Sequence, residues 1–117
     1  MIALTPHMRI FVAVDPVDFR KGIDGLIGVC RKTLSKDPFS GHLFVFSNRN
    51  HTSLKMLLYD GQGFYLCQKR LSQGRFTWWP DKMHERSEQL SSHEMHQLLW
   101  NSDPKKNPAA PIWKAIR

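Results

Sequence analysis

Histidine and acidic side chains come closest to a catalytic pattern at His93-Glu94-Met95-His96. A zinc-binding helix of the metalloprotease type needs two histidines four residues apart, with a glutamate beside the first. Here the two histidines are three residues apart, so that ligand geometry is not matched. The segment is therefore predicted to be a solvated helix surface and not a metal site.

Carboxylates gathered around Mg²⁺ would be the other route to catalysis, as in a nuclease or transposase. The aspartates available in the first half of the chain are Asp15, Asp18, Asp24, Asp37 and Asp60. Most of them stand where helix caps and turns use aspartate. The sequence also contains no Gly-rich phosphate loop, nucleophile elbow or activated Cys/His arrangement. We therefore expect no catalytic residue, no metal and no cofactor.

Basic side chains alternate with aromatic ones between residues 49 and 79, where a single acid, Asp60, occurs. Such bases can neutralise phosphates, and exposed aromatic rings can stack on unpaired nucleobases. The alternative is that the rings are core and the bases keep a sheet edge soluble, and for the rings we favour the core. With two bases from the first helix, the candidate DNA-contacting residues are Arg20, Lys21, Arg49, Lys55, Lys69, Arg70 and Arg75.

The overall charge agrees with a polyanionic partner. The chain has 17 Lys and Arg against 10 Asp and Glu, a net charge of +7, although a solvated basic surface would give the same number. Two cysteines are too few for a disulfide framework. No apolar run approaches the roughly 20 residues of a membrane-spanning helix, and the N-terminus lacks an export signal. We expect a cytoplasmic protein without a membrane partner.

Hydrophobic periodicity divides the first half of the chain into elements. The β-branched segment 8–14 predicts a strand, and Asp15-Pro16 predicts the capped start of a helix over 16–35. A second strand is expected at 42–46. The segments 54–59 and 64–71 predict a hairpin around Asp60-Gly61-Gln62-Gly63, because glycine supplies the positive φ of tight turns.

Signals in the last third are weaker. A short strand is expected over 75–79 and a connecting loop over 81–89. Ser91 and Glu94 form a capping-box pattern that predicts a short helix over 92–100. We expect one α+β domain, residues 1–100, in which a mainly antiparallel sheet is covered by a long N-terminal helix with the short C-terminal helix packed alongside. A basic, Pro-rich tail follows at 101–117.

Four co-linear blocks resemble one family: DPVDFRKGIDGL, DPFSGHLFVFSNR, LKMLLYDGQGF and KRLSQGRFTWWP. They are similar to the transposition accessory protein usually called TnpB in the bacterial insertion-sequence family numbered sixty-six. The resemblance covers about residues 2–80. It implies a non-catalytic protein that assists a separate transposase, with that transposase, another accessory subunit and the DNA ends of the element as partners. We expect the basic residues to contact DNA within a transposase assembly; the alternative is a protein-binding adaptor for the transposase without direct DNA contact.

Overall fold

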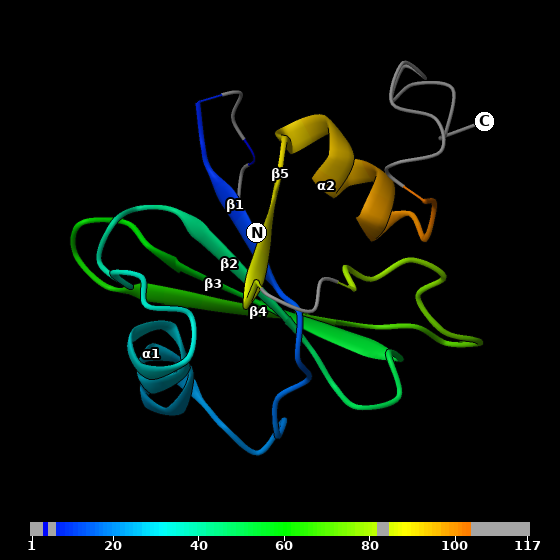
Figure 1. Ribbon diagram of the computed structural model, residues 1–117, viewed down its shortest axis with the longest axis horizontal. Helices are drawn as coiled ribbons and strands as arrows, with labels where there is room; N and C mark the ends of the chain where they lie inside the picture. Colours follow the sequence, from blue (N-terminus) through cyan, green and yellow to red (C-terminus); the bar gives the residue numbers. More distant parts are fainter. Residues whose placement is uncertain (1–3, 5–6, 82–84, 104–117) are drawn as a thin grey trace.

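A five-stranded sheet forms the centre of the computed structural model, which describes residues 4, 7–81 and 85–103 (Figure 1). The strand order is β4-β3-β2-β1-β5. The strands are β1 (Ile10–Ala13), β2 (Leu43–Ser47), β3 (Ser53–Tyr59), β4 (Phe64–Arg70) and β5 (Ser87–Leu90). β1 and β2 are parallel and the other neighbouring pairs are antiparallel. The predicted α+β fold with a mainly antiparallel sheet is confirmed.

The parallel pair is joined through helix α1 (Ile23–Lys32), as parallel strands require a crossover connection. β1 and β2 are buried along their whole length, which their continuous apolar sequences allow. On one face of the sheet, Leu26 and Cys30 of α1 pack in a cluster with Phe44 of β2. Burial raises the pKa of the Cys30 thiol to about 12, so this cysteine is a core residue that stays protonated at neutral pH.

The first helix is shorter than the predicted 16–35. Its N-cap is Gly22, which makes no side-chain capping bond, whereas the expected cap, Asp15, accepts a bond from Arg86 Nη1 at 3.4 Å. The amide of Val17 donates to the carbonyl of Ser47 at 2.9 Å. This contact with the end of β2 competes with helix formation, so residues 15–22 form an irregular segment instead of two helical turns.

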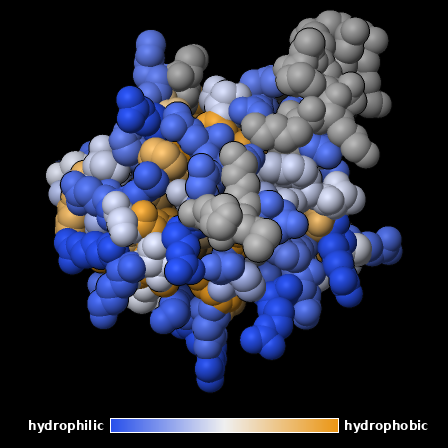
Figure 2. All heavy atoms as spheres, in the orientation of Figure 1, coloured by the Kyte–Doolittle hydropathy of each residue, from blue (hydrophilic) through white to orange (hydrophobic). Residues whose placement is uncertain are grey.

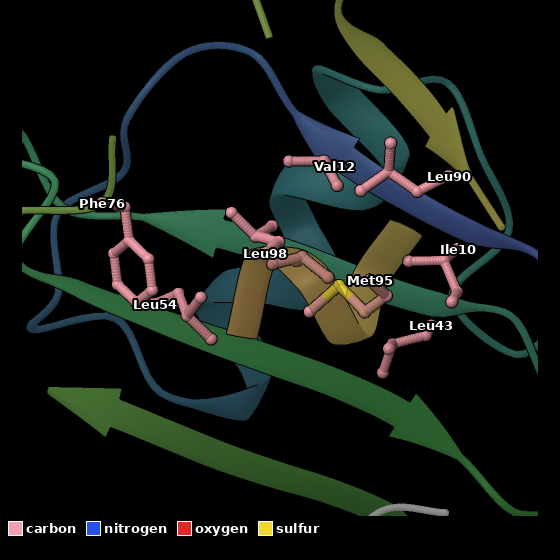
Figure 3. Packing of buried hydrophobic residues seen from close by; sticks show 9 residues of the cluster. Ile10, Val12, Leu43, Leu54, Phe76, Leu90, Met95 and Leu98 are labelled. Carbon is pink, nitrogen blue, oxygen red and sulfur yellow. The ribbon is translucent and has the colours of Figure 1, made fainter. Parts of the chain in front are cut away.

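Helix α2 (Ser92–Leu99) covers the opposite face of the sheet from α1 (Figure 1). The prediction that the two helices pack side by side is therefore wrong. The capping box is confirmed: the Ser91 side chain accepts from the Glu94 amide at 3.1 Å, and the Ser91 amide donates to the Glu94 carboxylate at 3.0 Å. Met95 and Leu98 of α2 lie among strand residues in the nine-residue cluster shown in Figure 3.

The segment after β4 differs from both predictions for it. Residues 75–79 form no strand, but they are packed: Phe76 is buried, and the Trp79 indole donates to the Ala13 carbonyl at 2.9 Å. Residues 87–89, expected within a loop, form β5 together with Leu90 and pair with β1. Only Leu90 of β5 is buried, so the strand carries almost no hydrophobic signal and is stabilised by backbone pairing. The expected tail overlaps residues 104–117, which lie outside the described residues.

The predicted hairpin is confirmed between β3 and β4. The Asp60 carboxylate accepts hydrogen bonds from the amides of Gln62 and Gly63 at 2.8 and 2.9 Å, and these bonds lower its pKa. Gly61 has φ +98°, a conformation that side chains disfavour. The turn fixes the register of the two longest strands, and with it the faces on which their basic residues lie.

Candidate nucleic-acid interface

Lys55 lies in β3 near the end of the sheet at which the chain leaves β2, and its ammonium is bound to backbone carbonyls. The side chain is buried, and Nζ donates to the carbonyls of Phe19 and Lys21 at 2.8 and 2.9 Å. Nζ also lies 4.9 Å from the centre of the Phe19 ring. Because its hydrogen bonds go to the backbone, Lys55 serves to hold the 15–22 segment against β3. We remove it from the candidate DNA-contacting residues.

This anchor leaves the next two candidates on the surface. Arg20 and Lys21 are both exposed. Arg20 forms an ion pair with Asp18, with Nη2 and Oδ2 2.6 Å apart, and hydrogen bonds from its side chain and amide lower the pKa of Asp18 to about 2. The Arg20 charge is thus partly compensated within the segment. The ammonium of Lys21 has no such ion pair among the described residues.

The loop between β2 and β3 presents Arg49 next to this segment. Asn48 shapes the loop: its Oδ1 accepts from the amides of Thr52 and Ser53 at 2.9 and 3.2 Å, and its Nδ2 donates to Thr52 Oγ1 at 2.8 Å. Arg49 and Asn50 are exposed at the tip. A groove of about 390 Å³ separates the loop from the 15–22 segment, and it is lined by residues 16–19 and 48–50.

Arg70 reaches the same end of the sheet from β4. It pairs with Ser53 at the start of β3, and it is exposed. Successive residues of a strand point to opposite faces, so Arg70 shares the α1 face with Phe64 and Leu66, which pack on the α1 cluster. We call Arg20, Lys21, Arg49 and Arg70 the basic surface. Figure 2 shows strongly hydrophilic side chains along the lower edge of the view, where the 15–22 segment and the β2–β3 loop lie in Figure 1.

The remaining two candidates lie on the α2 side. Lys69 points away from the α1 face, and its Nζ donates to the Leu99 carbonyl at the end of α2. Arg75 belongs to the loop after β4; its carbonyl accepts from Asn101 Nδ2 at 2.9 Å, and the loop packs through Phe76 on the α2 cluster. The structure thus brings four of the seven candidates to one end of the α1 face, directs Lys69 to the end of α2 and buries Lys55. Arg75 lies in a loop that is bound to the β2–β3 loop, since the Phe76 amide donates to the His51 carbonyl at 2.8 Å.

The groove also includes asparagines that the charge pattern did not identify. Asn48 and Asn50 flank Arg49, and the only signal for them was the turn-forming composition of the segment 47–53. The aromatic residues mostly follow the core interpretation. Phe76 is buried and Trp78 and Trp79 pack on the α2 cluster, whereas Tyr65 remains 49% exposed.

Two kinds of site were searched for among the described residues, a metal-binding group and a membrane-spanning helix. Among them, no group of three His, Cys, Asp or Glu side chains is close enough to hold a metal ion. Within the same part of the chain, no helix has the length and apolar character needed to cross a membrane.

Comparison with known proteins places the chain in one family. The family model described as IS66 Orf2 like protein matches residues 8–108. A Sinorhizobium fredii protein, y4jC, is 39% identical over 82 residues, which are 70% of each chain. A second protein of that organism, y4hO, is 37% identical over 78 residues, 67% of this chain and 68% of its own. No solved structure matches significantly. The chain belongs to the IS66 Orf2-like family, accessory proteins of the transposition machinery.

Proposed function

We propose that this protein is a non-catalytic transposition accessory protein that contacts the phosphate backbone of DNA through the basic surface. The observation that carries the proposal is the convergence of Lys21, Arg49 and Arg70 at one end of the α1 face, from three separate segments. Cations on one face can follow a duplex backbone, and Arg matches phosphate geometry well. Asn48 and Asn50 add polar groups to the same groove.

The rigidity of the surface supports the proposal further. The Lys55 anchor fixes the 15–22 segment, Asn48 fixes the β2–β3 loop, and the β3–β4 register fixes Arg70. Side chains on a preformed backbone lose less conformational entropy on binding than side chains on loops that must first be ordered. Contacts of this kind position a protein on DNA without reading its sequence, so base specificity would come from the transposase.

The test compares two triple variants of equal charge in electrophoretic shifts with terminal-repeat DNA. Lys21, Arg49 and Arg70 are replaced by alanine in one variant. The matched control replaces Arg9, Arg31 and Lys32, which are exposed at the opposite end of the sheet. We expect the first variant to bind specific and unrelated duplexes about equally more weakly, and the control to bind nearly as the parent does. Equal losses in the two variants would show that net charge, and not this surface, governs binding.

A protein-binding adaptor role is the second candidate, and Trp100 favours it. This side chain is 54% exposed at the end of α2, on the face opposite the basic surface, and exposed tryptophans are frequent anchors of protein interfaces. The test is a transposase pull-down with Trp100→Ala. If that variant loses the transposase while DNA affinity is unchanged, the two faces serve different partners. If the basic-surface triple variant loses the transposase but not DNA, the adaptor role replaces the DNA contact.

A further inference from the structure

The outer edge of β4 is long, and no other strand in the described part of the chain covers it. β4 has seven residues and contains no proline, and among the described residues no strand pairs with its outer side. The other edge strand, β5, has only four residues. Proteins normally shorten, cover or interrupt such edges because unpaired backbone groups bind other strands. The β4 edge therefore has the form of a pairing surface.

The hydrogen bonds at both ends of the hairpin show which backbone groups point outward. The Asp60 amide donates to the Gly63 carbonyl at 3.1 Å, and the Leu71 amide donates to the Thr52 carbonyl at 2.9 Å. In an antiparallel ladder, hydrogen-bonded positions alternate. The odd-numbered residues of β4 therefore bond to β3. The N–H and C=O groups of the even-numbered residues face the open edge, and these residues are Phe64, Leu66, Gln68 and Arg70.

We infer that two copies of this chain pair antiparallel through their β4 edges, in the register that places Cys67 opposite Cys67. In this register Leu66 lies opposite Gln68 and Phe64 opposite Arg70, and both are hydrogen-bonded pairs formed by the outward groups. All seven residues of each strand then find a partner. Shifting the centre to residue 66 or 68 leaves two residues at one end of each strand unpaired.

The side chains favour a second copy of the same strand as the occupant. The N-terminal half of β4 is aromatic and its C-terminal half is cationic, so antiparallel self-pairing sets rings beside cations on both faces. On the α1 face, Arg70 meets Phe64, whose ring lies 5.1 Å from that of Phe39. On the α2 face, Tyr65, which is 49% exposed, lies opposite Lys69, whose Nζ also donates to the Leu99 carbonyl of its own chain. Such contacts are favourable, and no like charges are opposed.

Symmetry gives this dimer a consequence for DNA. A two-fold axis perpendicular to the joined sheet keeps both α1 helices on one face. The two basic surfaces then lie on the same side of one continuous sheet. The inference does not depend on DNA binding, because it rests on the β4 edge alone.

The first measurement is sedimentation of the full chain without DNA over a range of concentrations. We expect a species of twice 13.7 kDa. Gln68→Pro should remove it while leaving the β3–β4 ladder intact, because the lost N–H points outward. Tyr65→Lys provides a second disruption, since it sets a cation against Lys69 across the dimer. A monomer at all concentrations, or a dimer that survives both changes in folded protein, overturns the inference.

Cross-linking then tests the register. Positions that are not hydrogen-bonded lie about 4.5 Å apart between Cα atoms, within disulfide range, so copper–phenanthroline and oxygen should link Cys67 to Cys67 in a Cys30→Ser variant. The matched control carries Cys30→Ser, Cys67→Ser and Gln68→Cys. Residue 68 is exposed, whereas Cys67 is half-buried, but residue 68 faces Leu66 of the other copy and should link poorly. Efficient linkage of the control with little linkage of Cys67 overturns this register.

Discussion

At the scale of single residues, the structure separates cations that look alike in the sequence. Lys55, Lys69 and Arg70 all lie in strands of one hairpin. The ammonium of Lys55 donates to two backbone carbonyls, and that of Lys69 donates to the carbonyl at the end of α2, whereas Arg70 is exposed. Composition predicts the charge of a segment but not the face or depth of each side chain. Those depend on which face the first helix covers, which is decided by contacts distant in sequence.

The internal role of Lys55 gives the first prediction. Lys55→Ala leaves the carbonyls of Phe19 and Lys21 without their charged donor, and such a loss should lower the free energy of unfolding by about 1–3 kcal/mol. Urea denaturation measures it, with exposed Lys32→Ala as the control, for which we expect a change within about 0.5 kcal/mol. Equal midpoints for the two variants would contradict an anchoring role.

His51 gives a pH-dependent prediction. Burial, and then the charge of Arg75, lowers its pKa below the ordinary 6.5; its ring lies 5.5 Å from that of Trp79. The unfolded chain therefore takes up a proton more readily than the folded one. This contribution to stability is complete above pH 6.5 and is lost as the pH falls through the folded-state pKa. In His51→Gln, the melting temperature should fall less steeply than in the parent as the pH is lowered below 6.5. An equally steep fall in the variant would mean that other titratable groups cause it.

At the scale of elements, local signals succeeded where a short segment contains its own explanation. The hairpin turn and the Ser91 capping box are complete within a few residues, and both were predicted. The helix over 16–35 failed because Val17 bonds to Ser47, far along the chain. β5 was missed because its sequence, SEQL, is mostly polar and its partner is β1. Helix starts and edge strands here depend on tertiary contacts that periodicity does not contain.

The two glycines of the β3–β4 turn should contribute differently to stability. Gly61 has φ +98°, whereas Gly63 does not have a positive φ and has open space around the position of a Cβ atom. Gly61→Val should therefore destabilise the fold by about 1–3 kcal/mol, and Gly63→Val should cost less. Thermal melting of the two single variants compares them directly. A larger loss for Gly63→Val would mean that the turn geometry is different.

At the scale of the whole molecule, the two faces of the sheet have different chemistry. The α1 face ends in the basic surface, and the α2 face carries Trp100 with Lys69 beside it, the Lys69 Nζ 6.0 Å from the indole centre. If the protein contacts both DNA and the transposase, as we propose, opposite faces allow both contacts at once. The family assignment gives the accessory role, while the division between faces is our proposal.

Salt dependence of DNA binding tests that division, because each phosphate contact contributes about 0.9 to the slope of log affinity against log salt for duplex DNA. Replacing Lys21, Arg49 and Arg70 removes three cations from one face, so the slope should fall by about 2.7. Replacing Lys69, Arg70 and Arg75 removes the same charge but only one cation from that face, since Lys69 points to the opposite side of β4 from Arg70 and Arg75 belongs to the loop that packs through Phe76 on the α2 cluster. The expected change for this second triple is about 0.9.

Both triples must first be shown to sediment as the parent does, because each contains Arg70, which also lies in the β4 edge. With that satisfied, the ratio of the two slope changes reports on geometry and not on total charge, which is the same in both variants. A similar change of the salt slope in the two triple variants would mean that DNA contacts both faces or the end of the sheet. The proposal that DNA binds the α1 face would then be wrong. No change in either would leave the transposase as the partner of the basic residues.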